Sequence, residues 1–241
     1  MSLGAGGFRR SPPATVTRDA AEQPFWISFS DLMTALMVLF LVAMSVALLA
    51  ITHEISQSEE EKARRLEEID YFMTQLQEAT AGISGVVIKG RVVDFGERAR
   101  FPSNSHQLTP EQSRLLRGIA RRILELARNP LGKKWLKRVV VEGFADARGS
   151  YLYNLNLSLQ RSERLLCALL AAPPEPAALS EADRLLARDL FLVSGSSYNA
   201  LRASQEESRR IELRLEFLEI GELRRPSHDL PLEAELRCPL D

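Results

Sequence analysis

Residues 24–51, "PFWISFSDLMTALMVLFLVAMSVALLAI", decide the architecture of the chain. About 20 apolar residues cross a bilayer as a helix, and the 25 residues from Ile27 to Ile51 contain one charged side chain, Asp31. A cleaved signal peptide is the alternative, but its apolar part is usually only about 7 to 15 residues long. The stretch therefore predicts a transmembrane helix over residues 25–51, preceded by a flexible arm over residues 1–24.

Asp31 is the unusual residue of this helix. It lies about 7 Å beyond Trp26, whose ring suits the headgroup boundary, so we expect the carboxylate inside the apolar layer near one face. An ionised carboxylate there costs about 3 kcal/mol or more. Either water reaches Asp31 and it has no role, or it carries a proton or a sodium ion. A stripe of small or weakly polar side chains favours packing against other helices: Ser28, Ala35, Val38, Val42 and Ser45.

The remaining composition argues against several functions. The net charge of -1 gives no bias toward nucleic acid, and "KKWLKR" at 133–138 is interpreted as the solvated approach to a strand. No metal-ligand spacing, phosphate-binding glycine loop or nucleophile-base-acid set is present, so we expect no enzyme activity and no cofactor. Cys167 and Cys238 favour two free or buried thiols, although a disulfide becomes possible outside the cytoplasm.

Residues 52–84 have helical composition and are expected to form a linker. Four apolar residues follow the spacing of a coiled-coil seam: Leu66, Ile69, Met73 and Leu76. Two heptads are too few for a free coiled coil, so the linker extends the membrane helix or packs on a partner. It is also our candidate for a plug that blocks ion flow in the resting state.

An α+β domain is predicted over residues 85–220. Strands are expected at 86–95, 138–144 and 209–218, and helices at about 151–171 and 181–190. Another helix begins at a capping box of Thr109 and Gln112, with Pro110 in its first turn, and stops at "RNP". The tail, residues 221–241, is expected to be extended or poorly ordered.

A polar cleft is predicted beside the second strand. Asp146 follows that strand in a loop where Gly143 and Gly149 permit tight turns. Three residues of the next helix share one face at i, i+4 and i+7: Asn154, Ser158 and Arg161. An acid, an amide and a guanidinium suit a ligand that carries both an ammonium and a carboxylate. The alternative is an Asp–Arg ion pair that only ties the loop to the helix.

The membrane segment resembles that of the MotB family of stator subunits. "FWISFSDLMTALMVLFL" has that family's aromatic entry, aspartate, Met-Thr step and apolar run. In the family two such helices stand inside a ring of partner subunits and the aspartate carries the ion. The resemblance implies that Asp31 is the ion-carrying residue and that the chain is a homodimer.

The soluble part is similar to OmpA-like peptidoglycan-binding domains. In "VEGFADARGSYLYNLNLSLQRSERL" the motif positions of that family are matched by Asp146, Gly149, Asn154, Leu157, Ser158 and Arg161. "ESRRIELRLEF" resembles its closing block, with Arg209, Arg210 and Glu212 in place and Ser208 at the usual asparagine. Phe144 and Ala145 replace the usual His-Thr, and the helix at 181–190 looks like an insertion.

The resemblance implies a mixed sheet with helices on one face. It also implies that Asp146 and Arg161 hold the diaminopimelate of a peptidoglycan stem peptide, and that Asn154, Ser158, Arg209 and Arg210 belong to the same binding site. Such a domain lies in the periplasm, which places the N-terminus in the cytoplasm. Charge alone leaves the orientation open, because three Lys or Arg residues flank each end of the span.

Within the stator-like group, the span, short arm and short linker most resemble the ZorB family of Zorya anti-phage defence systems. This implies a ZorA-like, MotA-type partner, with five partner copies around two of this chain. It also implies an inner-membrane motor driven by H⁺, or by Na⁺, that signals to cytoplasmic effectors. A motility stator such as that of the flagellum and a passive peptidoglycan tether are the alternatives.

Overall fold

The computed structural model describes residues 19–171, 178–224 and 238–240. Most of the predicted arm and much of the predicted tail, residues 1–18, 225–237 and 241, lie outside the described residues. The chain divides into two compact units, Met1–Glu60 and Glu61–Asp241. We describe each unit separately.

The first unit is built on helix α1, Asp19–Thr80, which continues into the second unit. Among the described residues, α1 is the helix long and apolar enough to cross a membrane, with a mean hydropathy of 2.7 in its most apolar window. The hydroxyls of Thr34, Ser45 and Thr52 donate to carbonyls one turn earlier, at 2.8, 2.7 and 2.9 Å. These polar groups are therefore satisfied within the helix, as a lipid environment requires.

The end of α1 belongs to the core of the second unit. Ile69, Phe72, Met73 and Leu76 are buried, and the ring of Phe72 packs edge-on against Phe217, with 5.6 Å between centroids. Most of the linker expected at 52–84 is thus a continuation of the candidate membrane helix. Three of its four seam residues, Ile69, Met73 and Leu76, pack within their own domain, whereas the fourth, Leu66, is exposed.

Polar contacts fasten the same part of α1. Arg65 Nε donates to the carbonyl of Leu218 at 2.8 Å. Glu68 accepts from Lys134 Nζ at 2.6 Å and from the indole N–H of Trp135. These bonds add orientation to the apolar packing, because each joins α1 to a residue far away in the sequence.

The second unit contains a five-stranded mixed sheet in the order β1-β2-β5-β3-β4. β3, Leu136–Gly143, runs parallel to β4, Phe191–Gly195, and antiparallel to β5, Ile211–Phe217. The predicted strand at 86–95 is instead a hairpin of β1, Val87–Lys89, and β2, Val92–Asp94. The chain reverses there because Gly90 adopts φ +57°.

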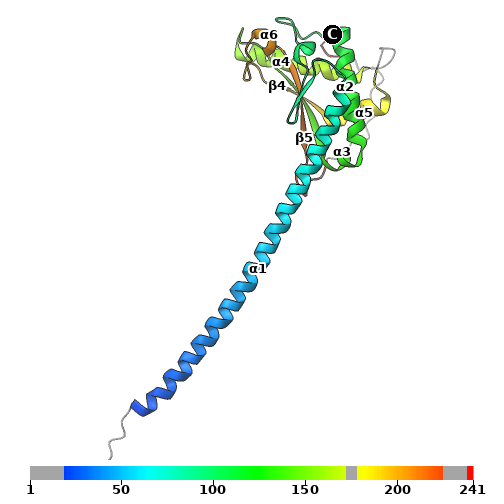
Figure 1. The fold of residues 1–241 in the computed structure, drawn as a ribbon. Helices are drawn as coiled ribbons and strands as arrows, with labels where there is room; N and C mark the ends of the chain where they lie inside the picture. The colour runs from blue at the N-terminus through cyan, green and yellow to red at the C-terminus, as the bar shows by residue number, and fades with distance from the viewer. Residues whose placement is uncertain (1–18, 172–177, 225–237, 241) are drawn as a thin grey trace, which may run out of the picture. The chain divides into compact units, whose positions relative to one another are not determined.

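Helices cover one face of this sheet. α4, Tyr151–Leu170, and α5, Glu181–Leu190, pack on β3 and β4, and α2, Pro110–Arg128, packs on α4 and α5. α3, Pro130–Trp135, and α5 both lie beside α2 (Figure 1). Alternate residues of β3 and β5 face the helices and are buried: Val139, Val141, Leu213 and Leu215. The expected α+β class, with helices on one face, is confirmed.

The other sheet face is charged. Arg138 pairs with Glu216 and Arg214 pairs with Glu142 across β3 and β5, each at 2.5 Å. Alternation between apolar and charged residues is what a sheet with one covered face requires.

The local signals of α2 are confirmed. Thr109 Oγ1 accepts from the Gln112 backbone N–H at 3.1 Å, and the Gln112 side chain accepts from the Thr109 N–H at 2.9 Å. The helix ends at Arg128, before Asn129 and Pro130. Three short helices had no counterpart in the sequence-based prediction: η1, Gly96–Ala99, α3, Pro130–Trp135, and α6, Gln205–Ser208.

β4 was also missing from the prediction. It follows α5 directly and forms the edge of the sheet beside β3. The helix interpreted as an insertion therefore leads from α4 into a sheet strand. Ala187 and Leu190 of α5 are buried in the core.

Gly143 serves a close approach rather than the expected tight turn. A Cβ there would stand 1.9 Å from the Ser158 carbonyl oxygen, and a Cβ at Gly195 would stand 2.7 Å from Ser158 Oγ. These two glycines let α4 lie directly on the ends of β3 and β4. Gly149, at φ +94°, does supply a turn.

Replacing Gly143 by Ala should lower the free energy of unfolding by about 3 kcal/mol, because backbone must move to admit the methyl group. Gly118 of α2 is the control, since a Cβ there meets nothing within 4 Å. Gly118→Ala should stabilise the domain by about 1 kcal/mol through helix propensity. Thermal and urea unfolding measure both variants, and equal stabilities would contradict the close approach.

Candidate functional site

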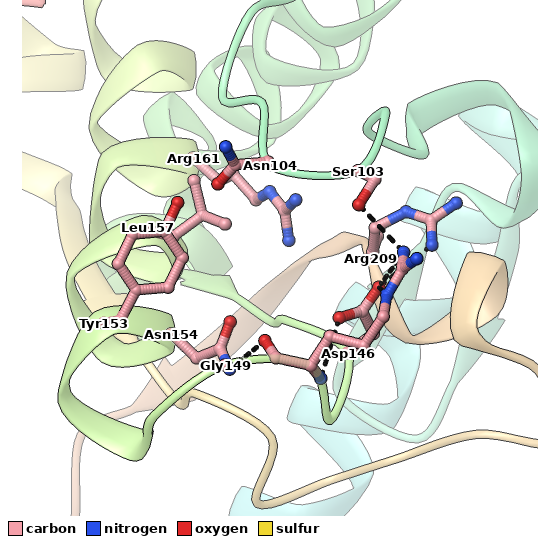
Figure 2. A pocket seen from close by; sticks show the side chains of 10 residues that line it. Ser103, Asn104, Asp146, Gly149, Tyr153, Asn154, Leu157, Arg161 and Arg209 are labelled. Carbon is pink, nitrogen blue, oxygen red and sulfur yellow. Dashed lines mark hydrogen bonds and ion pairs between the residues drawn. The ribbon is translucent and has the colours of Figure 1, made fainter.

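A cavity of about 210 Å³ opens where the loop after β3 meets the start of α4. Helix α4 contributes one wall, with Tyr153, Asn154, Leu157 and Arg161. Figure 2 shows the Arg161 guanidinium and the Asp146 carboxylate on different sides of the hollow. The sequence-predicted acid, amide and guanidinium do meet at one cleft.

The Asp146 carboxylate accepts hydrogen bonds from two arginine side chains and one backbone N–H. Its Oδ2 accepts from Arg148 Nη2 at 2.8 Å, Arg148 Nε at 3.3 Å and Arg209 Nη1 at 3.0 Å. Its Oδ1 accepts from the Arg148 backbone N–H at 3.1 Å. Burial alone would raise the pKa of the Asp146 carboxyl, but the hydrogen bonds from Arg148 and Arg209 outweigh it and lower the pKa. Asp146 is a fixed negative charge at neutral pH.

Arg161 is fully buried and is held by backbone carbonyls. Its Nη1 donates to Phe144 at 2.6 Å, its Nε to Ser105 at 2.9 Å and its Nη2 to Pro102 at 3.3 Å. Burial lowers its pKa to about 10, so the guanidinium stays charged at neutral pH. A buried cation whose hydrogen bonds go to neutral carbonyls is suited to receive an anion.

Asp146 and Arg161 do not form the ion pair that the alternative interpretation expects. Asp146 does tie elements together, but its partners are Arg148 and Arg209 instead of Arg161. Arg209 Nε also donates to the Phe101 carbonyl at 2.9 Å. Asn154 is buried and donates from Nδ2 to the Arg148 carbonyl at 2.8 Å, which fixes the loop over the start of α4.

Two residues predicted for the site lie elsewhere. Ser158 is buried between elements, where its Oγ donates to the Leu155 carbonyl at 2.8 Å and accepts from the Ser197 N–H at 3.0 Å. Arg210 stacks over the Phe144 ring at 4.0 Å and donates to Glu212 at 2.7 Å. Neither lines the cavity.

Four lining residues were missed by sequence reasoning. Arg148 lies two residues after Asp146 in the same loop, and Tyr153 is adjacent to Asn154, so proximity to the motif was the available signal. Ser103 and Asn104 come from the loop before α2, and no local pattern links that loop to the motif. Asn104 adopts φ +57°, a conformation that asparagine tolerates better than most residues.

No protein-family model matches the chain. The chain is 40% identical over 210 residues to Zorya protein ZorB of Escherichia coli O139:H28 (strain E24377A / ETEC), covering 86% of this chain and 85% of that protein. The chain belongs to the ZorB family.

Solved structures similar to this ZorB-family chain include an OmpA-like domain and a MotB domain. The OmpA-like domain of FopA1 from Francisella tularensis is 16% identical, with a TM-score of 0.35, and covers 56% of this chain and 82% of that one. The periplasmic domain of Helicobacter pylori MotB is 15% identical, with a TM-score of 0.37, and covers the same shares, 56% and 82%.

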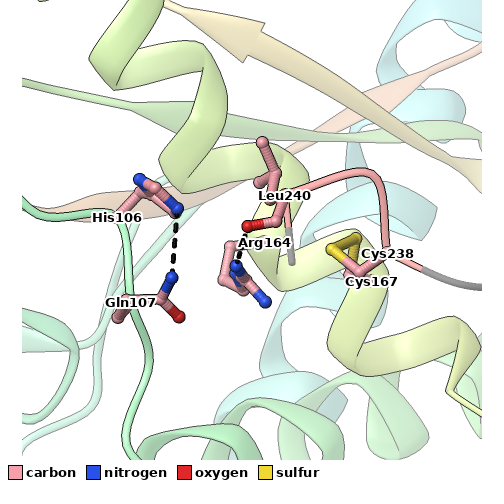
Figure 3. Close-up of a disulfide and its surroundings, with 6 residues drawn as sticks. All are labelled: His106, Gln107, Arg164, Cys167, Cys238 and Leu240. Carbon is pink, nitrogen blue, oxygen red and sulfur yellow. Dashed lines mark hydrogen bonds between the residues drawn. A yellow bond between two sulfur atoms is a disulfide. The ribbon is translucent and has the colours of Figure 1, made fainter.

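A disulfide joins Cys167 of α4 to Cys238 in this ZorB-family chain, so the favoured interpretation of free thiols is wrong. The spacing of the two cysteines could not reveal the pairing, since 71 residues separate them. Figure 3 shows the bond with Leu240 nearby, whose carbonyl accepts from Arg164 Nη2 at 2.9 Å. Residues 238–240 are thus fastened to α4. Among the described residues, no group of three or more His, Cys, Asp or Glu could hold a metal.

Acid should destabilise this domain partly through Asp146. Its pKa is lowered in the folded state, so its stabilising contribution is present above the unfolded value of about 3.9 and is lost as the pH falls through the folded pKa. Asp146→Asn should therefore be less stable at pH 6 and should lose less stability between pH 6 and pH 3. Unfolding at a series of pH values checks this, and equal pH slopes would contradict it.

Proposed function

We propose that this ZorB-family chain is the wall-anchored stator subunit of an ion-driven inner-membrane motor in anti-phage defence. The name of its relative, Zorya protein ZorB, supports the assignment to defence. The observation that carries the proposal is the pairing of two sites on one chain. The apolar stretch of the candidate membrane helix, residues 27–51, holds a single carboxylate, Asp31, and the soluble unit holds a cationic cavity.

Asp31 is the proposed ion carrier. All side chains from Trp26 to Ile51 are exposed in this single chain, so lipid or other helices must cover them in a membrane. One helix cannot form a conduction path alone. A ZorA-like, MotA-type partner, expected as five copies around two of this chain, would supply the remaining walls. The ion is H⁺ or Na⁺.

The cavity is the proposed peptidoglycan site. Asp146 Oδ1 faces one donor among the described contacts and retains capacity for a ligand ammonium. Arg161 offers its charge to a ligand carboxylate from the other side of the hollow. This pairing suits the diaminopimelate of a stem peptide, and Asn154 holds the loop that carries Asp146.

The disulfide supports the proposed orientation. Disulfides persist in oxidising compartments such as the bacterial periplasm and are rare in the cytosol. The Cys167–Cys238 bond therefore favours a periplasmic second unit and a cytoplasmic N-terminus. This argument is independent of the balanced charges that flank the span.

Protonation of Asp31 would remove its charge and loosen its contact with a partner helix. Re-ionisation toward the cytoplasm would draw in the next partner subunit. Two such helices inside a ring of five cannot both be satisfied at once, which favours stepwise rotation. The membrane potential supplies about 2.3 kcal/mol per charge per 100 mV. A plug formed by Ile69, Met73 and Leu76 would first have to leave the domain core.

Wall binding is tested by sedimenting the purified full-length chain, in detergent, with insoluble peptidoglycan. We expect wild-type protein in the pellet and its release by soluble stem peptide that contains diaminopimelate. Stem peptide with lysine in that place should release much less, because it lacks the carboxylate expected to face Arg161. Protein that stays in the supernatant would overturn the proposed anchoring.

A further inference from the structure

We infer that Arg148 recognises a second carboxylate of the ligand, beyond the ammonium–carboxylate pair assigned to Asp146 and Arg161. The inference rests on the proposed peptidoglycan site. It names the ligand class more narrowly, as a peptide with one ammonium and at least two free carboxylates near it. Arg148 would then be a specificity-determining residue.

The charge of the cavity is the first argument. Three guanidiniums, of Arg148, Arg161 and Arg209, line it together with one carboxylate, Asp146. These side chains carry two positive charges in excess. A ligand ammonium raises that excess, and a single ligand carboxylate only cancels the ammonium. A second carboxylate is needed before ligand binding lowers the charge of the site.

The three arginine side chains differ in how far they are exposed and in what holds them in place. Arg161 is fully buried and pinned by three carbonyls, and the Arg209 side chain is 11% exposed and pinned by Phe101 and Asp146. The Arg148 side chain is 53% exposed, and within the described part of the chain its partners are two side chains, Asp146 and Ser103. Arg148 can therefore turn toward a ligand without exposing a buried backbone carbonyl.

The contacts of Asp146 permit this movement. Oδ2 receives three bonds, two of them from the Arg148 side chain. If Arg148 turns to a ligand carboxylate, Asp146 keeps Arg209 and the Arg148 backbone N–H, and the ligand ammonium reaches the vacated position at Oδ2 as well as Oδ1. One exchange thus satisfies both ends of the ligand. Before ligand binds, Ser103 holds the Arg148 guanidinium at the cavity, because its Oγ accepts from Arg148 Nη2 at 2.8 Å.

Calorimetric titration of the full-length protein in detergent tests this inference. The probes are the synthetic stem tripeptide N-acetyl-Ala-γ-Glu-diaminopimelate, which has one ammonium and all carboxylates free, and versions amidated at one carboxylate at a time. The carboxylate beside the free ammonium is the one assigned to Arg161. Among the other carboxylates, amidation of one should weaken binding to wild type about fivefold to tenfold, because that one is assigned to Arg148. Arg148→Gln should bind the free peptide about as weakly as wild type binds that amide, and should not distinguish the two.

The control is Arg122→Gln on α2, which removes the same charge from a half-exposed ion pair with Glu125. It should keep the wild-type discrimination. If amidation lowers the affinity equally in wild type and in Arg148→Gln, the inference is overturned. It is also overturned if Arg148→Gln binds every peptide more tightly than wild type, because Arg148 would then only compete with the ligand for Asp146. If wild type binds all the peptides equally, the inference fails and wall binding stands. If wild type binds none, the proposed site itself fails.

Discussion

Asp31→Asn is expected to reduce phage protection to the level of cells that lack the system. Asparagine has nearly the shape of aspartate but cannot ionise, so it can neither release a proton nor hold a cation by charge. It is also cheaper to place in the membrane, so insertion of the helix should not suffer. The measurement is plaque formation by a panel of phages on cells carrying the whole operon, with protein levels matched by immunoblot.

Asp70→Asn is the matched control. Asp70 lies exposed on the same helix, outside the apolar stretch, and its replacement removes the same charge. Protection should remain at the wild-type level. If Asp31→Asn also protects fully, ion use is not required and the chain acts as a passive tether.

Features encoded by neighbouring residues were predictable. The apolar run around Asp31 predicts a membrane helix from length and composition alone. The Thr109–Gln112 capping box and the "RNP" step mark α2 because a cap satisfies backbone groups within a few residues of itself. The i, i+4, i+7 spacing of Asn154, Ser158 and Arg161 placed one helix face near Asp146.

Features that depend on distant residues were not predictable. Ser158 lies on the face of α4 that packs on the strands. Its hydrogen bond from the Ser197 N–H shows that it holds the segment after β4 and does not line the cavity. The seam predicted from Leu66 to Leu76 was correct for its last three members, which pack in the domain core, but spacing could not show that partner or that Leu66 is exposed. A short edge strand such as β4 carries too few residues for a periodic signal.

The ion partners of the site show the same limit. Spacing brought Asp146 and Arg161 to one cleft, yet Asp146 bonds to Arg148 and Arg209. Arg209 is 63 residues away in the sequence. Local reasoning could identify the charges that meet but not which of them neutralise one another. Arg161 is consequently left with its charge facing the cavity.

Arg161→Met should therefore abolish wall binding, lowering affinity at least about tenfold. It removes the cation that faces the ligand and leaves the carbonyls of Pro102, Ser105 and Phe144 without this donor. Unpaired buried carbonyls should also lower the free energy of unfolding by about 3 kcal/mol or more. Sedimentation with insoluble peptidoglycan measures binding, and urea unfolding measures stability.

Leu165→Ala separates the two effects. Leu165 is buried one turn further along α4 and does not line the cavity, and its truncation should cost about 2 to 5 kcal/mol. Assayed where both variants are still folded, Leu165→Ala should sediment with peptidoglycan and Arg161→Met should remain in solution. The same contrast should hold in phage protection, since an unanchored stator cannot do work against the wall. Equal sedimentation of the two variants would mean that Arg161 only supports the fold, and the ligand carboxylate would have to be assigned to another guanidinium of the cavity.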